Sequence, residues 1–246
     1  ALVKWEFAGQ QPGQIEKFLP GGLDGEEILN LLQLPNNERL SLGLLSSDGR
    51  FKRLPLKEVT ELSGRAATIL KLKDKVTLKA AVICHPKGEV AIVSSYGRVL
   101  KLEVNNESLP IMGKLAQGPI AMRIFPGEII IGAISTKIDS LNNLILISKY
   151  GKLKKIKLNT IRRCKRGDLG EMIIDLHNQT NSIDHVVDVF DGTASGNIMS
   201  NQGRSSRITP IELDKMTTEE IQNNLIALKE GEYIEKIMPL INPEGV

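Results

Sequence analysis

The residues of this chain that could do chemistry are lysines and arginines at repeated positions. Four copies of one pattern run over 46–54, 94–102, 148–156 and 200–208, with their glycines 48, 54 and 52 residues apart. In each copy, two apolar residues precede a Ser, and two variable residues then lead to a Gly. A basic residue follows the Gly, and after two more variable residues come a second basic residue and then Leu or Ile. The basic residues one and four positions after the glycine are Arg50, Arg53, Arg98, Lys101, Lys152, Lys155, Arg204 and Arg207. Cations repeated at a fixed period could form a belt that attracts a polyanion.

Further basic residues extend this set. Lys52 and Lys154 lie within two of the copies, and the segments between copies add Arg65, Lys114, Arg162, Arg163, Lys165 and Arg166. The net charge is only +3, so the argument depends on where the charges lie. The alternative is a solvated lysine-rich face. Because side chains alternate along a strand, not all of these residues can face outward, and some are expected to pair with acids such as Glu58 and Glu103.

No catalytic or metal-binding group is visible. His85, His177 and His185 are isolated, and the two cysteines lie 80 residues apart, which favours buried reduced thiols. The chain has no Gly-rich phosphate loop that ends in Gly-Lys. A composition of 41% hydrophobic and 25% charged residues is typical of a globular protein, and no apolar run is long enough to span a membrane.

The elements that position the cations are predicted to be β-hairpins. The run 144–147 is short and apolar, as in a buried strand, and Ser-x-x-Gly after it is turn chemistry in which Gly supplies a positive φ. The segment 99–104 alternates apolar residues with Lys101 and Glu103, which predicts one dry and one wet face.

The full unit of about 50 residues adds a strand before the hairpin and a connector after it. A period of this length predicts a propeller-like array, with one four-stranded blade per repeat. We therefore expect an all-β fold, with residues 1–246 forming a single ring of about five blades. Residues 1–7 and 231–242 each supply part of a blade, and together they would form a split blade that closes the ring. The chain begins inside a strand-like segment, which suggests a piece of a longer protein.

The repeated hairpin, the connector 113–118 and the Gly-Glu turns at 127–128 and 231–232 resemble a known family. They are similar to the C-terminal domain of the A subunit of bacterial type IIA DNA topoisomerases, that is, gyrase and topoisomerase IV. The resemblance implies a β-pinwheel, whose blades exchange a strand with their neighbours, and double-stranded DNA bent around a basic rim formed by the cations named above.

The resemblance also implies partners and cofactors. The partners would be the ATPase B subunit of an A2B2 holoenzyme, together with the rest of the A subunit. ATP and magnesium would bind elsewhere in that holoenzyme, with no cofactor in this chain, and the location would be cytoplasmic, at the nucleoid. The chain itself would be non-catalytic.

One departure from the family concerns a basic box. Gyrase carries a Gln-Arg-Arg-Gly-Gly-type box in the loop after its first basic strand, whereas the corresponding loop 9–14 has neither Arg nor Lys. Gyrase and topoisomerase IV therefore both stay open. Two other classes also stay open: a propeller that binds a protein partner, and a propeller enzyme, which would need convergent acids, histidines or a metal cluster.

Overall fold

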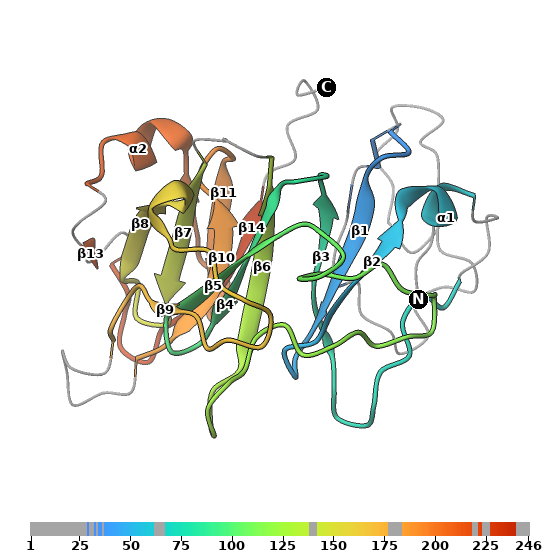
Figure 1. Ribbon diagram of the computed structural model, residues 1–246. Coiled ribbons are helices and arrows are strands. Elements are labelled where there is room, and N and C mark those ends of the chain that lie inside the picture. The colour runs from blue at the N-terminus through green and yellow to red at the C-terminus, as the bar shows by residue number, and fades with distance from the viewer. Residues whose placement is uncertain are drawn as a thin grey trace, which may run out of the picture.

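A computed structural model describes residues 37–61, 67–137, 142–176, 184–217, 221–222 and 227–239, together with residues 29, 32, 34 and 35. The described part consists of antiparallel sheets with a few short helical turns, which confirms the all-β prediction (Figure 1). The strands are β1 (Ser41–Ser46), β2 (Phe51–Pro55), β3 (Leu78–Cys84), β4 (Glu89–Ser94), β5 (Arg98–Glu103), β6 (Ile130–Thr136), β7 (Asn143–Ser148), β8 (Leu153–Lys157), β9 (Glu171–Met172), β10 (Val186–Asp191), β11 (Gly196–Ser200), β12 (Ser205–Ile208), β13 (Ile221–Gln222) and β14 (Ile234–Pro239). The helical turns are α1 (Leu56–Thr60), α2 (Pro210–Asp214) and the 3-10 turn η2 (Leu158–Thr160).

All four predicted hairpins are confirmed. They are the pairs β1–β2, β4–β5, β7–β8 and β11–β12. Their turn glycines, Gly49, Gly97, Gly151 and Gly203, have φ between 77° and 81°, the left-handed region that a side chain disfavours. In each turn the glycine amide donates to the carbonyl of the serine three residues earlier. Local turn chemistry therefore fixes the repeated unit.

Each sheet combines two successive repeats. The first strand of every hairpin pairs on its other side with a strand that follows that hairpin in the chain, as β1–β3, β4–β6, β7–β10 and β11–β14. Of these, β3, β6 and β10 precede the next hairpin. We call β3, β6, β10 and β14 the exchanged strands. This pairing confirms the strand exchange that the family resemblance implied. The prediction that one continuous unit makes one blade was wrong in this respect, because the strand before each hairpin joins the preceding hairpin's sheet.

The described part holds four sheets, two with four strands and two with three. The outer edges of β5 and β8 are paired with the short strands β9 and β13. Isolated bridges join Arg53 of β2 to Ile111, and Arg50, just before β2, to Ile120. Of the predicted split blade, residues 1–7 lie outside the described part, as does the loop 9–14. The C-terminal strand β14 pairs with β11, in the sheet of the fourth hairpin.

The hydrophobic core lies between neighbouring sheets. Leu144 and Leu146 of β7 pack with residues of the β4–β5 hairpin, whereas Ile145 and Ile147 pack with residues of the β11–β12 hairpin. Both faces of β7 are therefore buried, which explains its continuous apolar run. The same arrangement overturns the wet face predicted for 99–104, because Lys101 on β5 is only 4% exposed.

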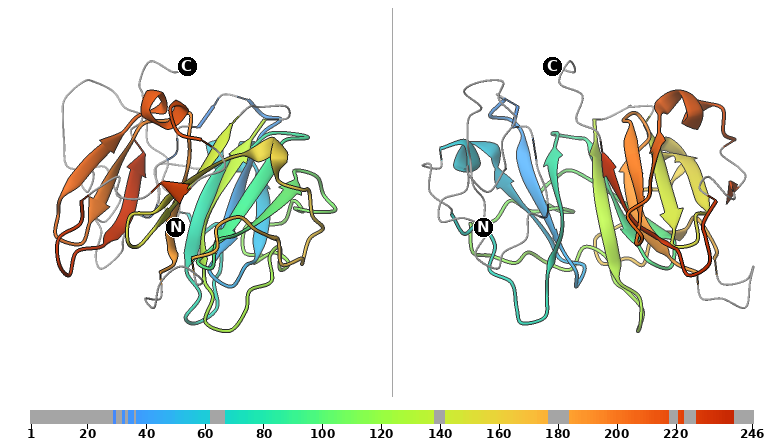
Figure 2. Two further views of the ribbon diagram at one scale, coloured as in Figure 1. Left: turned by 90° about the vertical axis from the view of Figure 1, so that its left-hand side faces the viewer. Right: turned by 180° about the vertical axis from the view of Figure 1, so that it is seen from behind.

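The exchanged strands contact one another in succession, β3 with β6, β6 with β10 and β10 with β14. Figure 1 shows β6 between the sheet of β1 and β2 and the sheets of the C-terminal half, with α1 and α2 on opposite flanks. The view from behind in Figure 2 shows the same order of sheets. Within the described residues, no helix is long and apolar enough to cross a membrane.

Candidate nucleic-acid interface

The basic residue one position after each turn glycine pairs with a carboxylate. Four ion pairs repeat around the array: Arg50–Asp48, Arg98–Glu128, Lys152–Asp184 and Arg204–Glu232. In the second and fourth pairs the acid follows a turn glycine and lies just before the exchanged strand. These cations therefore join a hairpin to the strand that the next repeat contributes.

Arg98 makes the most enclosed of these contacts. Its side chain is 5% exposed, and that of Glu128 is fully buried. Arg98 donates to both carboxylate oxygens of Glu128 and to the carbonyls of Leu169 and Arg123, and its guanidinium lies 4.6 Å from the centre of the Phe125 ring. Burial by itself would raise the pKa of Glu128, but hydrogen bonds from Arg98 and the Phe125 amide hold that pKa below its usual value.

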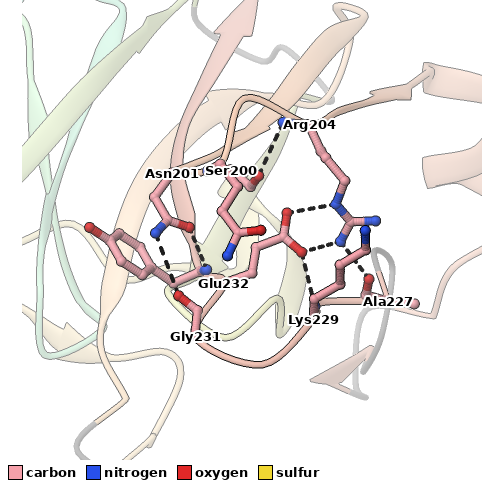
Figure 3. Close-up of polar contacts among 9 residues, drawn as sticks. Ser200, Asn201, Arg204, Ala227, Lys229, Gly231 and Glu232 are labelled. Atoms are coloured by element: carbon pink, nitrogen blue, oxygen red, sulfur yellow. Dashed lines mark hydrogen bonds and ion pairs between the residues drawn. The ribbon is translucent and has the colours of Figure 1, made fainter.

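Arg204 repeats this arrangement at the last hairpin (Figure 3). Its Nε lies 2.7 Å from Glu232 Oε1, and Nη2 donates to Glu232 Oε2 and to the Ala227 carbonyl. Glu232 Oε2 also accepts from the Lys229 amide. The hydrogen bond from Arg204, assisted by that amide, lowers the pKa of Glu232 to about 2. Unlike Arg98, the Arg204 side chain is 39% exposed.

The basic residues four positions after the glycine bind main-chain carbonyls of the following repeat. These carbonyls lie 56 to 58 residues further along the chain, where the next hairpin ends. Arg53 donates to Leu109, Lys101 to Leu158 and Lys155 to Leu213, whereas Arg207 is exposed. A carbonyl buried without a donor is costly, so these contacts stabilise the junction between repeats.

Lys52 is the most deeply buried cation. Its side chain is 0% exposed, and its Nζ donates to the carbonyls of Ile69, Gly113 and Lys114 at 2.6–2.9 Å. Burial lowers the pKa of Lys52 to about 8. An ammonium enclosed by three carbonyls has no donor left for a phosphate.

These positions correct most of the predicted DNA-binding set. In this conformation a phosphate cannot reach the buried residues. Arg50, Lys152 and Arg204 are partly exposed but already ion-paired. Arg65 lies outside the described residues. The buried residues are Lys52, Arg53, Arg98, Lys101, Lys154 and Lys155.

Six of the predicted cations are exposed. They are Lys114, Arg162, Arg163, Lys165, Arg166 and Arg207. Four of them fall within five consecutive residues, 162–166, which we call the basic loop. These six are the exposed side chains of the predicted set, and Arg163 among them is ion-paired with Glu89.

The basic loop is fixed to the outer edge of the second sheet. The Cys164 amide donates to the Lys101 carbonyl, and the Gly167 amide donates to the Ala121 carbonyl at 2.7 Å. Beyond the loop, β9 pairs with β5, and Arg98 holds the Leu169 carbonyl. The main chain of the loop is thus anchored on both sides, while the side chains at 162, 163, 165 and 166 are exposed.

A groove runs beside the loop and carries both signs of charge. One wall is formed by residues of the preceding connector, and the other by the basic loop. The lining residues are Glu103, Asn105, Glu107, Ser108, Arg163, Cys164, Lys165 and Arg166. Burial raises the pKa of the Cys164 thiol, so the thiol is neutral at pH 7. Within the described part, no three His, Cys, Asp or Glu side chains are arranged to hold a metal ion.

The sequence reasoning missed residues of two kinds. Arg123 is exposed beside the loop, with its Nε 2.5 Å from the Gly167 carbonyl, but it is not in phase with the hairpins. The buried acids Glu128 and Glu232 were seen only as parts of turns. The Gly-Glu turn and the basic residue after the hairpin glycine recur with the same period. That shared period indicated that the glutamate of the turn pairs with the basic residue of the hairpin.

Comparisons with known proteins find a matching family model and similar sequences. The family model described as DNA gyrase C-terminal domain, beta-propeller, matches residues 44–85 and 142–190. The A subunit of DNA topoisomerase 4 from Synechocystis is 24% identical in a 214-residue alignment that covers 81% of this chain and 23% of that protein. The A subunit of DNA gyrase from Mycoplasma genitalium is 24% identical over 212 residues, 86% of this chain and 25% of that protein.

Solved structures show the same fold. A DNA gyrase A C-terminal domain aligns with a TM-score of 0.67 at 16% identity, covering 84% of this chain and 68% of the other. The C-terminal domain of DNA topoisomerase IV aligns with a TM-score of 0.68 at 16% identity, covering 84% and 64%. The chain is thus similar in sequence and fold to the C-terminal domains of gyrase and topoisomerase IV A subunits. It spans about a quarter of the length of the two curated relatives, and its fold is the β-pinwheel of those domains.

Proposed function

We propose that this β-pinwheel binds and bends double-stranded DNA on its outer edge, and that the basic loop is the main contact. The observation that carries the proposal is the placement of four exposed cations within residues 162–166 on an anchored main chain. Phosphate contacts of this kind position a duplex but do not read its sequence. The similarity to gyrase and topoisomerase IV C-terminal domains supports the same ligand.

Fewer basic residues are available to contact DNA phosphates than the repeat pattern predicted. Six exposed cations of the predicted set remain, and Arg123 is a seventh. Arg163 among them is ion-paired with Glu89, which leaves six. Arg207 is the only exposed phased residue in the described part, since the other phased cations are buried or ion-paired. Each phosphate contact changes the slope of log affinity against log salt by about −0.9, so six contacts correspond to a slope of roughly −5. Bending 20–30 bp by 40–90° costs about 1–6 kcal/mol, which several contacts on one arc must offset.

For the whole protein, we propose the A subunit of an ATP-dependent type IIA topoisomerase in the cytoplasm, at the nucleoid. This pinwheel, non-catalytic itself, would present bent DNA for strand passage, giving supercoiling in a gyrase or relaxation and decatenation in a topoisomerase IV. One partner would be the rest of the A subunit. The other would be an ATPase B subunit, which would bind ATP and magnesium outside this chain.

The test is binding of the 246-residue chain to ~40 bp duplexes over a salt series, with end-to-end energy transfer to report bending. The triple variant Arg162→Gln, Lys165→Gln, Arg166→Gln should reduce the salt slope by roughly 2.7, the contribution of three contacts.

The matched control removes three exposed lysines that lie on or beside the exchanged strands, Lys87, Lys137 and Lys236. It makes the same change in net charge and should leave the slope nearly unchanged. Equal losses in the two triple variants would show that binding depends on overall charge. No binding at low salt would refute the DNA role and favour a protein-binding propeller.

A further inference from the structure

One acidic side chain lies between the core and the basic loop. Glu89, the first residue of β4, has a side chain only 14% exposed. Its Oε1 is 2.5 Å from the Nε of Arg163, and its Oε2 is 3.6 Å from the Nζ of Lys101. Lys101 also donates to the Leu158 carbonyl. The carboxylate thus pairs with one buried cation and with one half-exposed cation of the loop.

This acid occurs at a position that is uncharged in the other repeats. Glu89 lies eight residues before the turn glycine of its hairpin, where the other three copies have Ser41, Asn143 and Ser195. Ser41 takes a related role, because its hydroxyl accepts from Arg53, the counterpart of Lys101. A charged residue is therefore not required there for the repeat to fold.

The partner of this acid is equally specific to one blade. Lys101 bridges to Arg163, and the counterpart bridge in the preceding sheet joins Arg53 to Ile111. An apolar residue thus occupies the corresponding place on the neighbouring connector. Of the two described connectors with such a bridge, only the one that carries the basic loop has an acid–arginine pair of the Glu89–Arg163 kind.

We propose that Glu89 restrains DNA binding by the basic loop, because its carboxylate competes with a DNA phosphate for the guanidinium of Arg163. The inference rests on the DNA-binding role proposed above. A carboxylate and a phosphate accept from the same guanidinium donors, so Arg163 cannot serve both fully at once. With Arg163 held by Glu89, the loop offers a duplex Arg162, Lys165 and Arg166, and the negative charge of Glu89 stays beside the phosphate path.

The direct test is the Glu89→Gln variant in the salt series. The substituted amide is uncharged and would release Arg163, adding about one phosphate contact. Affinity near 0.1 M salt should rise about three- to tenfold, and the slope should steepen by about 0.9. The matched control is Glu61→Gln, an exposed acid at the end of α1 that pairs with Lys57 and makes the same change in net charge. It should change affinity less than twofold.

A second variant covers the case in which Glu89→Gln fails to fold, which thermal unfolding would reveal. Arg163 is half-exposed, so Arg163→Gln should fold, and it should leave the salt slope unchanged because Arg163 is already committed to Glu89. Arg166→Gln, which removes an exposed cation of the same loop, should lower the slope by about 0.9.

Three results would overturn the inference. Equal gains in Glu89→Gln and Glu61→Gln would reduce it to an effect of net charge. A loss of slope in Arg163→Gln equal to that in Arg166→Gln would show that Arg163 contacts DNA despite Glu89. Wild-type protein that does not bind DNA at low salt would refute both this inference and the proposed function, whereas the first two results leave the proposed function standing.

Discussion

Replacing Arg98 with Met should destabilise this chain more than any other single substitution at the repeated basic positions that carry a carboxylate partner. Arg98 is 5% exposed and Glu128 fully buried, so the substitution leaves an ionised carboxylate in the core without its guanidinium partner, although the Phe125 amide still donates to it. Removing one partner of a buried ion pair costs about 3–5 kcal/mol. Domains are stable by about 5–15 kcal/mol in total, so the loss is a large fraction of that reserve.

The assay is urea unfolding followed by far-UV circular dichroism, with Arg204→Met as the matched control. Arg204 makes the same set of contacts with Glu232, but its side chain is 39% exposed, and water can replace the missing donors. The control should therefore lose much less stability. The double variant Arg98→Met, Glu128→Gln should recover part of the loss, because it also removes the stranded charge.

The pH dependence of stability gives an independent check on how Arg98 affects the charge of Glu128. In the wild type, the pKa of Glu128 lies below its unfolded value of about 4.3, so its stabilisation is present above that pH and is lost as pH falls through the folded pKa. Without Arg98, burial raises the pKa of Glu128, and the Arg98→Met variant should instead gain stability as pH falls toward 5. Equal losses in Arg98→Met and Arg204→Met, or a double variant no better than the single one, would refute the reasoning.

Two further predictions concern the backbone and a buried acid. Gly97→Ala should cost far more stability than Gly203→Ala. Both glycines have positive φ, but a Cβ at Gly97 would lie 2.2 Å from the Ile174 carbonyl oxygen, whereas nothing lies within 4 Å of a Cβ at Gly203. Equal urea midpoints for the two variants would contradict this prediction. Burial raises the pKa of Asp188 to about 6, although its carboxylate accepts from the Ile237 amide. Because the folded pKa lies above the unfolded value of about 3.9, its contribution is most favourable below pH 4 and is lost as pH rises to about 6. In the Asp188→Asn variant, the urea midpoint should vary less between pH 4 and 7 than in the wild type. The same pH dependence in both proteins would contradict the raised pKa of Asp188.

The hairpins could be predicted because everything that specifies them lies within ten residues. Ser-x-x-Gly between apolar runs fixes both the turn and the strands that flank it, and all four turn glycines have the expected positive φ. The strand exchange could not be read in this way, since a period is the same whether a strand pairs with the hairpin before it or after it. That feature entered only through the family resemblance.

The fate of the phased cations was not predictable from their spacing. A fixed period states that Arg98 and Lys101 recur in space, but not whether they face outward. The groups that bury them come from the next repeat: the Leu158 carbonyl is 57 residues away from Lys101, and the Leu169 carbonyl is 71 residues away from Arg98. Strand alternation alone suggested a wet face for Lys101, and a neighbouring sheet and connector cover it instead.

The array thus assigns two different tasks to its basic residues. Cations in phase with the repeat are fixed by the need to join each hairpin to the next, as the matching contacts of Arg98 and Arg204 show. Exposed cations on the connectors are not needed to join the repeats, so their number can differ from blade to blade. For example, Arg163 on the connector after β8 corresponds to Ile111 on the connector after β5. A change on a connector alters the charge of the rim without disturbing the junctions, and Glu89 adjusts that charge from inside the sheet. We therefore expect the strength of DNA binding in this pinwheel to follow the exposed connector residues and not the repeat motif by which the array is recognised.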